Sequence, residues 1–386
     1  MVTYSGVAVA SHLIIRLVLQ PQLEAARAEL SVLEPKILAD LKLLNDEPLF
    51  PNSAREKNAE HFLSGFIAWS GHMAKPLSTV EHQRLVELMS SHKQALTDTE
   101  HWAKFRADPN LKALDLSWVD QLVAYDHINL ESQVDQSWVL EQVEKSNGVE
   151  RIGIAERLPM PELQELQFAA LARAAQLHNE KRVNEALPLH RHVSQLLAST
   201  DCLVGSALAA SMLKNETVLA DRVGAKWTPM DLNKLAAFKR ASWAWIGIQS
   251  LRATHEIGAF GPYLNRKTSA CTGAFELLGT TSQLRDFFVP TAFLETDFSE
   301  KFALADKFRG HVLDECGHES LKVFLKPVPK EANPLFVGRH RANIERIPFV
   351  RRLYGLQLIL IASPNFFRLY EERQPASNPP QVDESL

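Results

Sequence analysis

The sequence predicts an all-α, multi-helical fold in which antiparallel helical hairpins form two packed units around a buried central helix. Glycine is scarce, with 16 among 386 residues, and there is no series of short alternating strands joined by Asn-Gly or Asp-Gly turns. Four segments match the capping box, in which a hydroxyl residue at the helix start pairs with Glu or Gln three residues later. They are Ser53–Glu56, Ser78–Glu81, Thr97–Glu100 and Thr280–Gln283.

The central helix is expected at about residues 230–253. Its start is marked by Thr228-Pro229-Met230-Asp231, because proline at the first helical position loses no hydrogen bond and an acid there lies near the positive end of the helix dipole. The apolar residues that follow are first spaced helically and then become almost continuous, at Leu232, Leu235, Phe238 and Trp243–Ile248. A helix that is apolar on most sides is an internal helix.

Further helices are expected where apolar residues recur with helical period between short polar connectors. Upstream of the central helix they are Gln22–Leu44, Ser53–Ser70, Ser78–Leu96, Thr97–Arg106, Ser117–Tyr125 and Ser132–Lys145. Downstream they are Thr281–Phe288, Ser299–Glu315, Pro348–Ala362 and Asn365–Arg373. Pro35 should kink or split the first of these helices, because it removes one backbone hydrogen bond.

The helical period is lost from Ser146 to Pro161, where two glycines and two prolines occur, and this stretch predicts a domain boundary. We therefore expect an N-terminal apolar segment (1–20), an N-terminal helical unit (21–150) and a C-terminal helical unit (160–373). The last residues, 374–386, are rich in Pro, Gln, Asn, Ser and acids, a composition typical of a disordered tail.

The segments Pro161–Leu177 and Val183–Thr200 predict a helical hairpin around the polar turn His178–Arg182. The small and apolar residues Ala174, Leu177 and Ala186 resemble positions of a tetratricopeptide hairpin, where small side chains let two helices approach closely. The likeness covers one unit, whereas such repeats need about three copies to bury a continuous core. A generic helical hairpin is the simpler interpretation.

Charge and motifs exclude several function classes. The chain has 42 Lys and Arg against 46 Asp and Glu, for a net charge of −4, so no global positive field exists to bind nucleic acid. It contains no phosphate-binding Gly-x-x-x-x-Gly-Lys-Ser/Thr loop, no Gly-x-Gly-x-x-Gly, no Gly-x-Ser-x-Gly elbow and no His-Glu-x-x-His. These absences remove the nucleotide enzymes, α/β-hydrolases and zincins that are recognised by such motifs.

Three cysteines, Cys202, Cys271 and Cys316, are too few for a disulfide framework and too widely spaced for a knuckle-type zinc site. The sequence does not determine their redox state. Cys271 lies near Arg266 and Lys267, and such an electropositive setting would favour a reactive thiolate. A base beside the thiol cannot be placed from the sequence, so an unreactive cysteine is the preferred interpretation.

Two segments raise the question of membrane association. The apolar run Val7–Leu19 is shorter than a bilayer-spanning helix and fits a core-docking helix, a degenerate anchor or signal, or an interfacial helix. Basic residues beside the apolar stretch Leu353–Ala362 could bind an anionic membrane surface, namely Arg339, Arg341, Arg346, Arg351 and Arg352. The simpler alternative is that these arginines pair with acids of the protein and that the apolar stretch belongs to the core.

His311, Glu315 and His318 are spaced at i, i+4 and i+7, so on one helix they share a single face. Imidazole and carboxylate groups bind zinc, iron or manganese, and a Glu-x-x-His pair occurs in di-iron bundles. Such bundles need a second pair, which the chain lacks, and the glycine at 317 disfavours helix continuation. The alternative is a polar helix end with ordinary ion pairs and no metal or other cofactor.

Two other groups of polar residues are candidates for a site. Trp118, Tyr125, Asp126 and His127 form an aromatic and polar patch, which fits a core tryptophan with a hydrogen-bonded histidine better than a ligand-binding wall. His190 and His192 are two residues apart, so on a helix they face different directions and should not share a ligand.

These observations favour a non-enzymatic helical protein that binds a protein partner or a hydrophobic ligand between its helices. The alternative is a metal-dependent enzyme that uses His311, Glu315 and His318 with Zn, Fe or Mn. A third hypothesis is a membrane-associated protein held by its two ends. The sequence distinguishes neither the specific partner nor a cytoplasmic from a membrane-anchored or periplasmic location.

Overall fold

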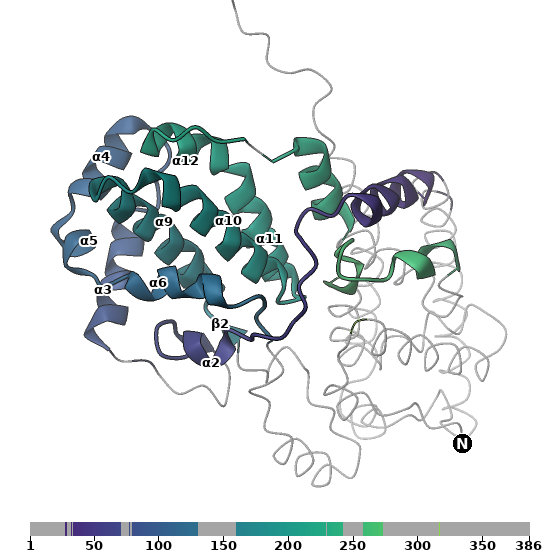
Figure 1. Ribbon diagram of the computed structural model, residues 1–386, viewed down its shortest axis with the longest axis horizontal. Helices are drawn as coiled ribbons and strands as arrows, with labels where there is room; N and C mark the ends of the chain where they lie inside the picture. Colours follow the sequence, from purple (N-terminus) through teal and green to yellow (C-terminus); the bar gives the residue numbers. More distant parts are fainter. Residues whose placement is uncertain are drawn as a thin grey trace, which may run out of the picture.

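The computed structural model describes residues 28, 32, 34–70, 77, 79–129, 160–228, 230–241, 258–272 and 316. These residues form an all-α fold, as the sequence predicts (Figure 1). Residues 34–46 and 232–241 are helical. The other elements are α2 (Glu60–Leu63), β1 (Trp69–Ser70), α3 (Val80–Ser91), α4 (Thr99–Ala107), α5 (Pro109–Ala113), α6 (Ser117–Gln121), η1 (Leu122–Ala124), β2 (Met160–Pro161), α9 (Leu163–Asn179), α10 (Val183–Ala198), α11 (Leu203–Lys214), α12 (Glu216–Val223) and η2 (Gly258–Tyr263).

The antiparallel hairpin of α9 and α10 lies at the centre of the fold, with α11 beside α10 (Figure 1). This hairpin confirms the prediction for residues 161–200. Ala174, Leu177 and Ala186 are fully buried in it, as expected where small side chains let helices pack closely. The two-residue strands β1 and β2 pair antiparallel just before α9 and tie its start to the segment after α2.

Helices α3, α4, α5 and α6 pack against α9. Phe105 of α4 lies 5.7 Å from Phe168 of α9, and Trp118 of α6 stacks on Phe66, which follows α2, with ring centroids 4.8 Å apart. One continuous hydrophobic core contains residues from Ala59 to Ile128 and from Leu163 to Val223. The helices on the two sides of the boundary predicted at 146–161 therefore share a core.

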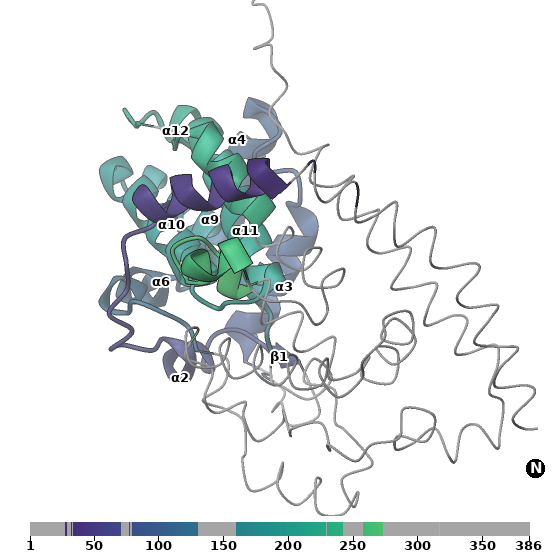
Figure 2. The same ribbon diagram turned by 90° about the vertical axis from the view of Figure 1, so that its right-hand side faces the viewer.

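Residues 34–46, 232–241 and 258–272 lie together on the α11 side of the hairpin (Figure 1), and the 34–46 helix runs across α10 and α11 in the view of Figure 2. Arg240 joins the two helical segments by donating from Nε and Nη2 to the two carboxylate oxygens of Asp40, both at 2.7 Å. Phe50 contacts Phe238 edge to face, with centroids 6.0 Å apart. Pro35, where the sequence predicts a kink or a break, is the second residue of the helical segment 34–46.

The predicted central helix is described only as far as residue 241. Leu235 and Phe238 are buried as expected, but Leu232 is 65% exposed. The helix begins at residue 232, and Asp231, not Thr228, caps it by accepting a hydrogen bond from the Asn233 amide. The apolar residues from 243 to 248 lie outside the described residues, so the enclosure of that stretch stays a prediction.

The helix predicted at Ser53–Ser70 is wrong for most of its length, because only Glu60–Leu63 is helical and Trp69–Ser70 is a strand. The Ser53 hydroxyl does not cap a helix but accepts a hydrogen bond from the Arg55 amide, 2.9 Å away. The carboxylate of Asp126 accepts from the amides of Glu56 and Lys57, both at 3.1 Å. A contact from seventy residues away thus replaces the hydrogen bonds that a first helical turn would need.

Two other predicted helix starts are displaced by one residue. Thr79 caps α3 by accepting from the His82 amide, and Asp98 caps α4 by accepting from the His101 amide. At α4 the N-cap is Asp98 and not its neighbour Thr97, because Asp is at least as favourable at this position as Thr. Helix α3 ends at Ser91, five residues before the predicted end at Leu96.

Several predictions lie outside the described residues. They concern the apolar run 7–19, the helix at 132–145, the helix start at 280, the four downstream helices, the arginine cluster at 339–352 and the tail at 374–386. Among the residues that are described, no helix is both long enough and apolar enough to cross a membrane.

Gly205 in α11 permits a close approach to the end of α10. A Cβ added there would lie 2.1 Å from Thr200 Oγ1 and 2.4 Å from the Leu197 carbonyl oxygen. We expect Gly205→Ala to lower the free energy of unfolding by about 1–3 kcal/mol, the usual cost of overpacking. Urea unfolding measures this loss. Gly65→Ala is the matched control, since its Cβ would meet its nearest neighbour at 3.7 Å, and equal stability of the two variants would contradict this packing.

His190 in α10 should make the protein less stable in mild acid. Burial, together with the nearby charge of Arg191, lowers the pKa of His190 from 6.5 to about 4. As the pH falls below 6.5, this histidine is therefore protonated in the unfolded chain but stays neutral in the folded protein. The free energy of unfolding decreases until about pH 4, where the folded protein also takes up the proton. The loss is about 3 kcal/mol.

Urea unfolding of the parent and of His190→Leu at pH 7 and pH 4 isolates this contribution. The loss in the free energy of unfolding between pH 7 and pH 4 should be smaller by about 3 kcal/mol in the variant than in the parent. His61→Gln, a change at an exposed histidine, controls for the loss of one imidazole. The same pH dependence in His190→Leu and the parent would contradict the burial of this side chain.

Candidate functional site

A pocket of about 220 Å³ lies where five segments of the chain converge at the C-terminal end of α10. Its walls come from residues 49–55, the turn after η1, the end of α10, the helix at 232–241 and the loop at 266–272. The lining residues include apolar, hydroxyl and charged side chains. Pro51, Asn52 and Lys267 are exposed, so the pocket opens to solvent beside them.

The backbone of this pocket contains unusual conformations. Four non-glycine residues have positive φ among those described, and three of them line the pocket: Arg55 at 54°, Asp201 at 52° and Ser269 at 56°. The left-handed conformation costs about 1–2 kcal/mol for residues other than glycine. Such conformations persist only where surrounding contacts impose them, and they cluster at binding and catalytic sites. Ser269 is fixed in this way by donating its hydroxyl to the Phe238 carbonyl at 3.1 Å.

Asp201 lies between two arginines. Its Oδ2 is 3.1 Å from Arg266 Nη2 and 3.6 Å from Arg55 Nη1. The Asp201 side chain is only 4% exposed, whereas the arginines are about a quarter exposed. Arg55 also donates to the Ser199 carbonyl at 3.1 Å, where a cation suits the negative end of the α10 dipole. The three charges therefore join residues 49–55, the α10–α11 turn and the loop at 266–272.

Asp126 forms another wall of the pocket. Burial raises the pKa of its carboxyl, but hydrogen bonds with His127 Nδ1 at 2.6 Å and with the amides of Glu56 and Lys57 outweigh burial and lower the pKa to about 2. Burial lowers the pKa of His127 below 6.5 against the opposing effect of Asp126, and the charge of Arg55 lowers it further. At neutral pH the pair is therefore an aspartate with a neutral histidine.

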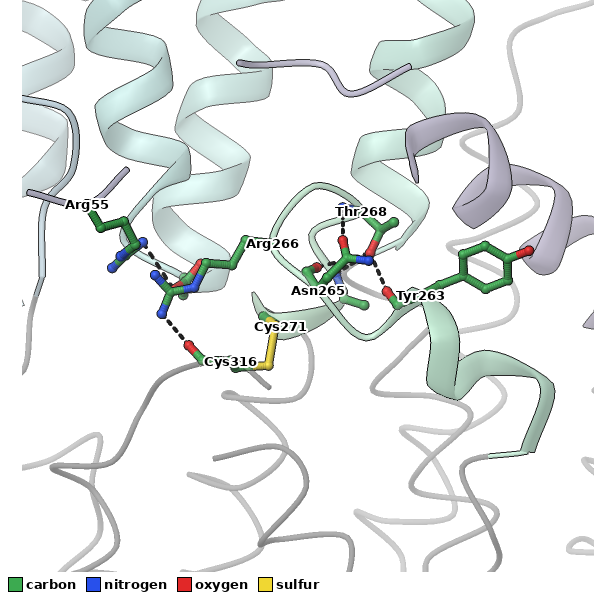
Figure 3. The surroundings of a disulfide bond; sticks show 9 residues. Arg55, Tyr263, Asn265, Arg266, Thr268, Cys271 and Cys316 are labelled. Carbon is green, nitrogen blue, oxygen red and sulfur yellow. Dashed lines mark hydrogen bonds and ion pairs between the residues drawn. A yellow bond between two sulfur atoms is a disulfide. The ribbon is translucent and has the colours of Figure 1, made fainter. Parts of the chain in front are cut away.

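A disulfide joins Cys271 to Cys316 next to the pocket (Figure 3), with the Cα atoms 5.6 Å apart. The disulfide excludes the alternative of a reactive Cys271 thiolate and agrees with the preferred interpretation of an unreactive cysteine, although Arg266 does lie close by and donates to the Cys316 carbonyl. Thr268 fixes this loop by donating its hydroxyl to the Tyr263 carbonyl at 2.6 Å. The third cysteine, Cys202, is buried at the start of α11, where its sulfur accepts a hydrogen bond from the Gly205 amide at 3.3 Å.

The aromatic and polar patch predicted at 118–127 separates into a core part and a pocket part. Trp118 is buried against Phe66, and Tyr125 stacks on Phe62 with centroids 5.2 Å apart. Of the four residues only Asp126 lines the pocket. His190 is buried, and His192 donates from Nε2 to the Leu122 carbonyl at 2.9 Å.

The predicted metal ligands His311, Glu315 and His318 lie outside the described residues. Cys316, which lies between them in sequence, is helical, buried and bonded to Cys271. Its sulfur is therefore not a metal ligand. In the part of the chain that is described, no three His, Cys, Asp or Glu side chains are grouped so that they could hold a metal ion.

The hydroxyl groups of the pocket hold the fold together. Ser199 donates to the Leu196 carbonyl at 2.6 Å and accepts from the Ile128 amide at 2.9 Å. Thr272 lies 3.4 Å from the Ser206 hydroxyl. A nucleophilic hydroxyl needs a base that takes its proton, whereas the Ser199 proton is directed at a main-chain oxygen. The Ser199 hydroxyl is therefore not positioned as a nucleophile.

Sequence reasoning noted Arg266 and Lys267 only as neighbours of Cys271, and it missed Arg55 and Asp201. No motif marks these two residues. The short stretch Thr200-Asp201-Cys202 between two helices was the one local signal, because an acid in a tight turn tolerates the left-handed conformation.

Comparison of the chain with protein-family models, with curated proteins and with solved structures finds no match to any of them.

Replacing Asp201 tests the charge cluster. Asp201→Asn keeps the shape of the side chain and tolerates a positive φ, but it leaves two arginines facing each other without the anion. We expect it to lower the free energy of unfolding by about 1–2 kcal/mol, less than for a fully buried pair because the arginines are partly exposed.

Urea unfolding at pH 7 measures this loss. Asp46→Asn is the control, because Asp46 forms an ion pair with Lys42 in which both side chains are more than half exposed and should leave the midpoint unchanged. If Asp201→Asn were as stable as the parent, Asp201 would not hold the two arginines together.

Proposed function

We propose that this chain is a non-enzymatic helical protein that binds a small organic ligand in the pocket at the C-terminal end of α10. The observation that carries the proposal is the convergence of five segments, distant in sequence, on one pocket whose walls contain three left-handed residues. Maintaining strained backbone around an open space has a cost in stability. Binding of a ligand that requires this backbone geometry would explain why the protein retains conformations that lower its stability.

The lining supports binding of a molecule with both polar and apolar parts. Leu49, Phe50 and Phe238 offer apolar surface, and the charged side chains offer groups that fix orientation. Small-molecule sites usually combine these two kinds of lining. The volume of about 220 Å³ lies below the range of about 300–1,000 Å³ that is usual for such sites, which favours a compact ligand over a protein segment.

Ligand-observed NMR with a set of neutral, anionic and cationic compounds of benzene size tests the proposal. The parent protein should bind at least one of them. Ala198→Phe places a ring in the pocket wall at the end of α10 and should abolish that binding. Ala113→Phe, at an exposed position at the end of α5, is the matched control and should retain it.

Circular dichroism and urea unfolding show whether Ala198→Phe still folds. The proposal is overturned if none of the compounds binds the parent, or if a folded Ala198→Phe protein binds them as well as the parent does.

A further inference from the structure

The charges around the pocket do not cancel. Arg55, Arg266 and Lys267 are cationic and Asp126 and Asp201 are anionic, which leaves an excess of one positive charge. The whole chain, in contrast, has a net charge of −4. The pocket is therefore a locally positive region on an acidic protein, and the exposed Lys267 lies where it opens.

Both acidic side chains are already engaged by groups of the protein. Asp126 accepts hydrogen bonds from the amides of Glu56 and Lys57 and from His127. Asp201 faces Arg55 and Arg266. A cationic ligand would find these carboxylates occupied and would be repelled by the cations beside them. An anionic ligand would meet cations that carry more charge than the two carboxylates neutralise.

The field of the two arginines extends beyond Asp201. Burial is the first cause that lowers the pKa of His127, and the charges of Arg55 and Arg266 both act in the same direction. His127 is the sequence neighbour of Asp126, which lines the pocket, so the positive potential reaches this side of the pocket.

The apolar part of the lining indicates what the anion should carry. Phe50 and Phe238 meet edge to face at the pocket, with Leu49 beside them, and aromatic edges pack well against a further ring. The volume of about 220 Å³ exceeds that of an engineered protein cavity of roughly 150 Å³ that binds benzene. The space is therefore enough for one ring with one small polar substituent.

We propose that the pocket binds a small aromatic monocarboxylate, with its carboxylate beside Lys267 and Arg266 and its ring against Phe50 and Phe238. A single negative charge balances the single positive excess, which favours a monoanion over a doubly charged phosphate. This inference rests on the proposed function and names the class of ligand for the same pocket.

Isothermal titration calorimetry at low salt with benzoate, benzamide and benzylamine tests the class of ligand, because the three share a ring and differ in charge. Benzoate should bind at least about tenfold more tightly than benzamide, as expected from charge-assisted hydrogen bonds. Protonated benzylamine should show no binding. Equal affinity for benzoate and benzamide, or a preference for benzylamine, overturns the inference.

Lys267→Glu reverses the exposed charge without removing a contact of the core. It should weaken benzoate binding by about tenfold or more and leave benzamide binding unchanged. Lys226→Glu, at another exposed lysine that does not line the pocket, is the control and should keep the affinity for benzoate. An unchanged affinity in Lys267→Glu overturns the placement of the carboxylate.

The outcomes separate the two proposals. If benzamide binds and Ala198→Phe abolishes its binding, but benzoate binds no more tightly, the ligand class is wrong and the proposed function stands. If neither these compounds nor the wider set binds the parent protein, both are overturned.

Discussion

The ion pairs of Asp201 with Arg55 and Arg266 are the interaction on which the pocket depends. Asp201 is almost completely buried, and a buried carboxylate is tolerated only where cations or donors face it. Its position in the turn between α10 and α11 therefore requires the segment containing Arg55 and the loop containing Arg266 to lie at the end of α10. The Arg266 side chain then reaches the Cys316 carbonyl, and the disulfide from Cys316 to Cys271 closes the same loop (Figure 3). The charge cluster and the covalent bond thus fix one wall of the pocket together.

Sequence reasoning predicts the fold well where local signals and tertiary packing agree. The hairpin of α9 and α10 follows from its apolar period and its polar turn, because both helices bury the faces that the period marks. It fails at residues 53–70, where the capping pattern of Ser53 is real but Asp126 binds the amides that the helix would use. The exposure of Leu232 has a different reason. Helical spacing shows which residues share a face, but not which turn of the helix leaves the core.

The candidate site is much less accessible to sequence reasoning than the fold. Arg55, Asp126, Asp201 and Arg266 span more than two hundred positions, and no fixed spacing links them. Their common property, a place at the end of α10, exists only after the chain has folded. The sequence indicates the electropositive surroundings of Cys271 but not its covalent partner, which lies 45 residues away. The metal hypothesis for residues 311–318 and the membrane hypotheses for the two ends concern other parts of the chain and stay predictions.

Asp201 and Arg266 meet in the folded protein, and this contact shapes the pocket. A double-mutant cycle with Asp201→Asn, Arg266→Gln and the double variant measures their coupling directly, because residues without contact give additive changes in the free energy of unfolding. We expect a coupling of about 0.5–3 kcal/mol, the range for contacting residues of one network. Additivity of the two single changes would contradict the contact, and with it the pocket that depends on it.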